Sequence, residues 1–325
     1  FLNNRLTGTF DWYRRNTKDM LVAGATLPAT LGASVPKSNS ADMKTIGWEL
    51  SLGWNDRLEN GFSYWVKGVL SDYQATITKY AGNDAGFYSQ SDGDGKYYVG
   101  QKIGEIWGYH SNGLFQSDDE AATIDQSELY AGKWGAGDVK YEDLDNDGKI
   151  TKGEETIYNP GDKSIIGNKT PRYQFGITVG FDYKNFDFEM FWQGTGKRDY
   201  MLSGAQFWGF TSQWDVPYTP ALDYWTETNT DAYFPRPGWQ NGGNRVTSDR
   251  YLQSAAYGRL KNLTVGYTIP KNLTTKWGIS RLRLYVTGEN LLTITPLNDA
   301  FDPETLGGMT YPINRKVAIG LNLTL

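Results

Sequence analysis

Between Arg172 and Trp192, every second residue is apolar or aromatic, and the residues between them are mostly polar or glycine. A period of two places alternate side chains on opposite faces of a β-sheet. The pattern is interrupted once, at Lys184-Asn185, so it predicts two strands joined by a very short turn. We predict that the apolar face meets lipid, as in a transmembrane β-barrel with aromatic girdles. This face carries Tyr173, Phe175, Ile177, Val179, Phe188 and Met190.

The same alternation recurs along the chain and predicts eight strands in total. The other six are expected at about Leu6–Arg15, Thr45–Asn55, Gly61–Thr78, Tyr257–Ile269, Arg281–Leu291 and Lys316–Leu325. Short connections (Asp56–Asn60, Lys184–Asn185, Pro270–Ser280) alternate with long ones (Thr17–Lys44, Lys79–Arg172, Gln193–Ala256, Leu292–Arg315). A soluble sandwich also alternates, but it does not account for long loops all at one end. The sequence therefore predicts an all-β protein, a transmembrane antiparallel β-barrel with short periplasmic turns and long extracellular loops.

Composition agrees with this class and excludes others. Of the 325 residues, 15% are aromatic and only 39% are hydrophobic, and no apolar run approaches the roughly 18 residues of a membrane helix. The net charge of −5 leaves no basic stripe for nucleic acid, and the absence of cysteine excludes a disulfide framework. The chain starts at Phe1 without a leader sequence, so we expect it to be a piece of a longer exported protein.

Several motifs, in order, resemble those of SusC/RagA-type TonB-dependent transporters. The most specific is Arg250-Tyr-Leu-Gln-Ser-Ala-Ala-Tyr-Gly-Arg-Leu-Lys-Asn-Leu-Thr-Val-Gly-Tyr-Thr-Ile-Pro270, which is similar to a late strand of that family and its turn. Further similar stretches are Gly137–Gly148, Ile166–Pro171, Tyr224–Arg236, Arg283–Thr293 and Asp302-Pro-Glu304. Two departures are the final Leu325, where the family usually has an aromatic residue, and the length, which matches only the family's last third.

The resemblance implies an architecture and a function. Residues 1–325 would be the C-terminal portion of a barrel, about its last eight strands of 22, with residues 79–172 as a large extracellular loop. The plug and the N-terminal domains would precede this chain. The family imports oligosaccharides or peptides across the bacterial outer membrane, with a SusD-like surface lipoprotein as lid and energy from TonB through the N-terminal part. The alternative is a self-contained eight-stranded barrel with an adhesin or structural role.

An acidic stretch at 143–154 matches the calcium-loop pattern. Asp143, Asp145 and Asp147 occupy positions 1, 3 and 5, and Gly148 at position 6 permits the sharp turn. The remaining expected ligands are the Lys149 carbonyl, Thr151 directly or through water, and Glu154 through both carboxylate oxygens. No long amphipathic helices flank the loop, so we expect a structural Ca²⁺ site that stiffens the large loop rather than a sensor. A solvated acidic turn is the alternative.

No catalytic set is evident, and we expect no enzyme. The only histidine, His110, is not accompanied by a nucleophile-elbow sequence, and an ordinary loop residue is the expected role. Aromatic residues of the long loops are better candidates for contact with a substrate or partner, because such rings are enriched at interfaces. The candidates are Trp107, Tyr109, Trp208, Trp214 and Trp239. The alternative for each is packing within the loops.

Overall fold

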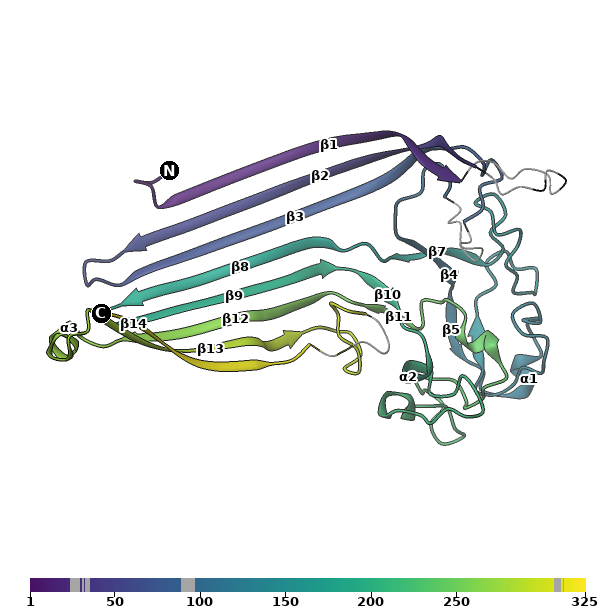
Figure 1. The fold of residues 1–325 in the computed structure, drawn as a ribbon. Coiled ribbons are helices and arrows are strands. Elements are labelled where there is room, and N and C mark those ends of the chain that lie inside the picture. Colours follow the sequence, from purple (N-terminus) through teal and green to yellow (C-terminus); the bar gives the residue numbers. More distant parts are fainter. Residues whose placement is uncertain (24–29, 31, 33–35, 89–96, 307–310, 312) are drawn as a thin grey trace.

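The computed structural model describes residues 1–23, 30, 32, 36–88, 97–306, 311 and 313–325. Its main element is one eight-stranded sheet in which every neighbouring pair is antiparallel (Figure 1). The strands follow chain order: β1 (Leu6–Ala23), β2 (Lys37–Arg57), β3 (Ser63–Tyr80), β8 (Arg172–Tyr183), β9 (Phe186–Lys197), β12 (Tyr257–Thr268), β13 (Arg281–Ile294) and β14 (Lys316–Thr324). All eight expected strands are confirmed.

The register places the expected apolar residues on one continuous face. Val179 pairs with Val66 of β3 and with Met190 of β9, and Phe181 pairs with Phe188. At the short-turn end, stacked rings such as Phe181 and Phe188, with centroids 5.1 Å apart, form a girdle. On the opposite face Gly180 leaves room for Trp65, since a Cβ there would lie 2.1 Å from the indole ring.

The first long connection was expected in the wrong place. Strands β1 and β2 continue to Ala23 and back from Lys37, well into the predicted loop Thr17–Lys44. In the β1 extension the apolar residues Met20–Ala23 follow one another and the register shifts twice between Thr17 and Leu21, so apolar alternation stops although the backbone ladder continues. Backbone hydrogen bonds need no lipid, which explains why alternation marks only part of each strand.

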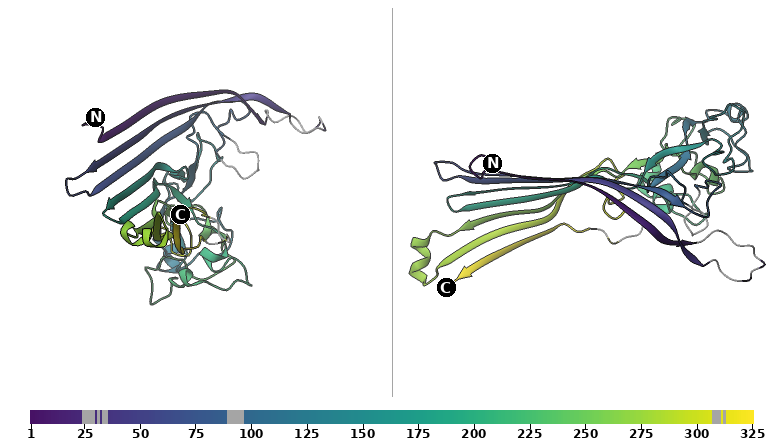
Figure 2. Two further views of the ribbon diagram at one scale, coloured as in Figure 1. Left: turned by 60° about the vertical axis from the view of Figure 1, so that its left-hand side comes forward. Right: turned by 90° about the horizontal axis from the view of Figure 1, so that it is seen from above.

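The short turns and the long connections lie at opposite ends of the sheet, as predicted (Figure 1). The turn 269–280 contains two short helices, α3 (Lys271–Thr274) and η4 (Thr275–Trp277). We call the described parts of 81–171, 198–256 and 295–315 the cap; Figure 2 shows it gathered at one end of the curved sheet. Among the described residues, no helix has the length and apolar character needed to cross a membrane.

The cap has its own secondary structure and hydrophobic core. It contains the strand pairs β4 (Glu105–Tyr109) with β7 (Lys163–Asn168), β5 (Ser111–Leu114) with β6 (Val139–Tyr141), and β10 (Asp199–Met201) with β11 (Leu252–Ser254). The short helices are α1 (Asp118–Ala121), α2 (Ala205–Trp208), η2 (Thr219–Leu222) and η3 (Gly242–Arg245). Fully buried Phe115, Tyr141, Phe207 and Tyr251 show that the loops fold as one packed unit.

Candidate functional site

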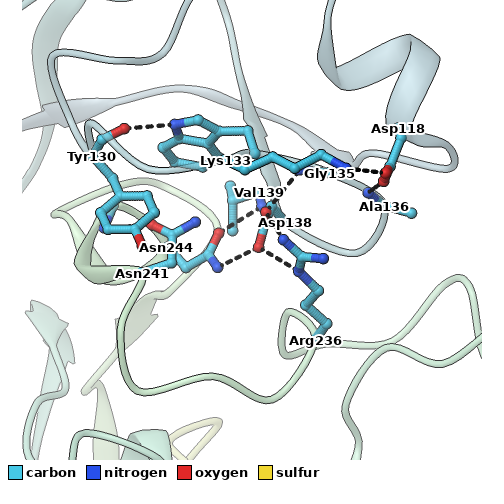
Figure 3. Close-up of polar contacts among 12 residues, drawn as sticks. Asp118, Tyr130, Lys133, Gly135, Ala136, Asp138, Val139, Arg236, Asn241 and Asn244 are labelled. Carbon is cyan, nitrogen blue, oxygen red and sulfur yellow. Dashed lines mark hydrogen bonds and ion pairs between the residues drawn. The ribbon is translucent and has the colours of Figure 1, made fainter.

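A buried carboxylate, Asp138, joins three segments of the cap (Figure 3). Only 1% of Asp138 is exposed, and its oxygens accept hydrogen bonds from Arg236 (3.0 and 2.7 Å), from Asn244 Nδ2 (2.8 Å) and from the backbone N–H of Gly135 (2.9 Å). Asn244 Oδ1 in turn accepts from the N–H of Val139 (2.8 Å). The motifs 137–148 and 224–236 therefore contact each other directly, so their role here is to hold the cap together.

A second polar cluster ties the cap to the sheet. Arg259, 2% exposed on β12, donates to Asp302 (2.6 Å) and lies 3.1 Å from Glu304. Lys261 also contacts Glu304, at 3.1 Å. The segment 295–306 is thereby fixed to the wall of strands, and its Phe301 packs into the cap core. These basic side chains therefore serve as partners of the loop 295–306.

The acidic loop 143–154 has the predicted sharp turn. Gly148 has φ +84°, and Asp143 accepts hydrogen bonds from the N–H groups of Asn146 (2.6 Å) and Gly148 (2.8 Å). Burial raises the pKa of Asp143, but these backbone donors outweigh it and leave the pKa below the ordinary value. Partial desolvation and the charge of Asp147 raise the pKa of Asp145, as expected where anions crowd together.

The carboxylates that the fold brings together differ from the linear pattern. Ligand oxygens of Asp143, Asp145 and Asp162 lie within 4.8 Å of one another, whereas Glu154 is exposed and outside this group. Asp162 is 1% exposed and accepts from the N–H groups of Leu144 (2.8 Å) and Thr151 (2.7 Å). After Thr151 the chain forms a compact excursion over 152–161 and returns with Asp162, whose N–H donates to the carbonyl oxygen of Thr151 (3.1 Å).

The remaining expected ligands flank this group. Asp147 accepts from the N–H of Lys149 (2.8 Å), and its carboxylate is not among the three that converge. On either side of Lys149 the backbone pairs with that of Asp125. The N–H of Asp125 donates to the carbonyl oxygen of Gly148 (3.0 Å), and the N–H of Ile150 donates to the carbonyl oxygen of Asp125 (2.7 Å). Ile150 is fully buried, so the loop is anchored in the cap core at this point.

The five candidate aromatic residues have different environments. Tyr109 and Trp208 are 2% and 8% exposed and belong to the cap core. Trp107 stacks on Tyr88, with centroids 4.1 Å apart and an interplanar angle of 10°. Trp214 and Trp239 are 83% and 45% exposed. The open ring surfaces for contact with a ligand or partner are therefore those of Trp214 and Trp239.

A cavity of about 720 Å³ lies in the cap, between β4, β7, β10 and the segment that follows the acidic loop. Its charged side chains are largely paired: Lys163 contacts Glu155 at 2.8 Å, and Lys152 lies 3.9 Å from Glu128. Burial, reinforced by the Glu155 charge, raises the pKa of Tyr88 in its wall. Sequence patterning carries no signal for this cavity, because its lining comes from seven separate stretches of the chain.

His110 links three cap segments. Its Nδ1 lies 2.7 Å from Asp249 Oδ2, and its Nε2 lies 2.7 Å from Ser164 Oγ. The three residue types are those of a hydrolase triad, but Ser164 lies within the β4–β7 ladder opposite Gly108. A nucleophile is normally lifted out of its strand on a tight strand-to-helix turn. We therefore assign the group a structural role.

Comparisons with known proteins agree with the sheet and its cap. No family model matches the chain. A TonB-dependent receptor of Formosa agariphila is 29% identical over 351 residues, covering 99% of this chain and 32% of that protein. The TonB-dependent receptor SusC of Bacteroides thetaiotaomicron is 26% identical over 330 residues, covering 99% of this chain and 30% of SusC. The chain thus spans about a third of the length of these relatives.

Solved structures show the same fold. The structure of the RagAB peptide transporter superposes with a TM-score of 0.73 at 21% identity, covering 99% of this chain and 34% of that chain. The RagAB peptide importer in its "open-open" state gives 0.72 at 20% identity. These relatives are transporters and receptors rather than enzymes. The resemblance is confirmed over 99% of the chain, which is similar in sequence to TonB-dependent receptors, SusC among them, and shares the fold of the corresponding third of the RagAB transporter.

Proposed function

We propose that this chain forms part of a TonB-dependent importer that takes up oligosaccharides or peptides through the outer membrane. The observation that carries the proposal is the combination of a membrane-type sheet with a folded, cavity-bearing cap at the long-loop end. The names of the relatives, among them SusC and a peptide transporter, support import as the activity. Energy would come from TonB through a plug in the remaining part of the protein.

The proposed partner is a SusD-like surface lipoprotein seated on the cap. The exposed side chains Trp214, Val216 and Leu222, at 58–83% exposure, support a protein contact there, because a solvated loop rarely keeps several large apolar residues open to water. The remaining strands of the transporter would pair with the two edges of the sheet. Among the described strands, β1 pairs only with β2 and β14 only with β13, which disfavours the self-contained eight-stranded barrel.

Uptake by living cells tests the import proposal. A strain without the gene and a complemented strain are given fluorescently labelled oligosaccharide and peptide pools, with and without a protonophore. Import requires accumulation that depends on both the gene and the proton-motive force. Loss of cell adhesion without any change in uptake would support the adhesin alternative instead.

We also propose that the acidic loop binds Ca²⁺, with Asp143, Asp145 and Asp162 as carboxylate ligands. This set departs from the linear pattern in two ligands: Asp162 takes the place expected for Glu154, and the carboxylate of Asp147 lies outside the group. Hard oxygen donors and a flexible ligand set favour Ca²⁺ over Mg²⁺, and comparable extracellular modules bind at roughly 10⁻⁴–10⁻³ M. Its role would be to fix the excursion 152–161 against the cap core.

Calorimetric titration with Ca²⁺ of the intact transporter, purified and treated with chelator, tests this proposal. Asp162→Asn is expected to weaken Ca²⁺ binding strongly, because it removes a ligand charge, whereas Glu154→Gln is expected to leave it nearly unchanged. If Glu154→Gln abolishes binding and Asp162→Asn does not, the linear pattern describes the site better. Absence of binding in all three proteins would leave an acidic turn.

A further inference from the structure

A second cavity lies between two loops of the cap. It has a volume of about 630 Å³, within the range of ligand sites, and is lined by Gln206, Tyr218, Thr219, Asn298, Asp299 and Ala300. One wall comes from α2 and the start of η2, and the other from the connection between β13 and β14. We call this cavity the loop groove.

Both walls of the loop groove are held in place by the same core. Phe207, next to Gln206, is fully buried, and its ring centroid lies 6.2 Å from that of Phe301 in the opposite wall. The second wall is also fixed through Asp302, which accepts from buried Arg259 at 2.6 Å. The groove is therefore formed before any ligand binds, which lowers the entropic cost of binding.

The polar side chains of the groove are free to bind a ligand. Among the described residues, no hydrogen bond or ion pair engages the side chains of Gln206 or Asp299, and Asn298 uses only Oδ1, as acceptor from the N–H of Ala300 (3.0 Å). Amides both donate and accept, whereas a carboxylate only accepts. Together they match a ligand with several neighbouring hydroxyl groups, each of which donates one hydrogen bond and can also accept.

An open aromatic ring completes the set. Tyr218 is 50% exposed and lines the groove, unlike Tyr88 of the larger cavity, which is 5% exposed and covered by Trp107. A free ring face offers an apolar surface to the C–H side of a sugar ring. No lysine or arginine lines the groove, and Asp299 would repel an anion, so a carboxylate-bearing ligand is disfavoured.

We infer that the loop groove is a binding subsite for a neutral oligosaccharide, with Tyr218 as the stacking surface and Gln206, Asn298 and Asp299 as hydroxyl partners. This inference rests on the proposed import function and narrows its substrate class. A peptide fits less well, because the groove offers neither a cation for a terminal carboxylate nor an enclosed apolar pocket for a side chain.

The test uses the intact transporter complex in detergent and calorimetric titration with short neutral gluco-, manno- and xylo-oligosaccharides. Oligogalacturonides and a pool of short peptides serve as comparison ligands. Binding of at least one neutral oligosaccharide is expected. Tyr218→Ala should weaken it about tenfold, the effect of losing one stacked contact, whereas Tyr218→Phe keeps the ring and should change it by less than about threefold. Asp299→Asn should weaken binding of the neutral oligosaccharide. It should also allow oligogalacturonides to bind, because the carboxylate that repels them is removed.

Tyr158→Ala is the matched control, because Tyr158 is a 77% exposed cap tyrosine that does not line the groove. The inference fails if no neutral oligosaccharide binds, if Tyr218→Ala and Tyr158→Ala have equal effects, or if peptides or oligogalacturonides bind in a Tyr218-dependent way. Energised uptake of peptides together with any of these results would overturn the subsite and leave the import proposal standing. Saturation-transfer NMR on Tyr218→Phe covers the case in which Tyr218→Ala does not fold.

Discussion

A single charge on the apolar face of β8 should reveal which side of the sheet meets lipid. Ile177 lies on that face, midway along the strand between Tyr173 and Phe181, and it is 40% exposed. It pairs with Gly68 of β3 and Trp192 of β9, so no acidic group stands beside it in the ladder. Ile177→Arg therefore places an unpaired cation near the middle of the membrane.

Ile177→Arg is expected to cost much more folding free energy than Thr178→Arg. An arginine on the lipid face near mid-membrane costs about 2–4 kcal/mol, which is roughly a 30-fold to almost 1,000-fold change in the ratio of folded to unfolded protein. Thr178, the next residue, faces the other side and pairs with Lys67 and Phe191. Even with Lys67 directly opposite, Thr178→Arg should cost no more than about 1 kcal/mol.

The assay is folding of the intact transporter into lipid vesicles, followed by heat-dependent mobility on gels and by guanidinium titration. Ile177→Arg should lower the folded yield and the denaturation midpoint, and Thr178→Arg should stay close to the parent protein. Equal losses for the two variants would refute the assignment of the faces. A larger loss for Thr178→Arg would invert it.

Three further variants and treatments test other parts of the structure. Gly180→Ala should cost about 1–3 kcal/mol by forcing Trp65 away, measured by guanidinium titration, whereas Gly68→Ala meets no atom within 4 Å and should be neutral. Asp138→Asn breaks a buried charge pair and should destabilise the cap by about 2–4 kcal/mol, seen as faster proteolysis of the cap, while Asp118→Asn should change little. Chelation of Ca²⁺ should expose residues 143–162 to protease and leave the eight strands intact. Unchanged cleavage would mean that no bound metal stabilises this segment.

The order and pairing of the eight strands could be predicted because lipid imposes a period of two on one face. The far ends of β1 and β2 could not, since the consecutive apolar residues Met20–Ala23 and the register shifts between Thr17 and Leu21 break the alternation there. There the backbone hydrogen bonds alone extend the strand, and backbone hydrogen bonds leave no trace in side-chain patterning.

The candidate site was only partly predictable for a related reason. Spacing along the chain identifies Asp143 and Asp145, which are two residues apart on one turn, but the third carboxylate depends on where the chain returns. That return is set by the excursion 152–161, in which Gly153 and Gly161 approach so closely that a Cβ on either would lie 2.5 Å from the other's backbone nitrogen. In the same way, the buried positions of Tyr109 and Trp208 follow from long-range packing.

We propose that this chain is a stretch of outer-membrane transporter barrel whose cap meets a surface lipoprotein. The most direct measurement is a cryo-electron microscopy structure of the protein purified from native outer membranes through a tag in the cap. The account expects β1 and β14 each to pair with further strands in one larger closed barrel, the face of Ile177 to lie in the detergent or lipid belt, and a lipoprotein to sit on the cap. An isolated eight-stranded barrel closed by pairing of β1 with β14, with no partner on the cap, would contradict it.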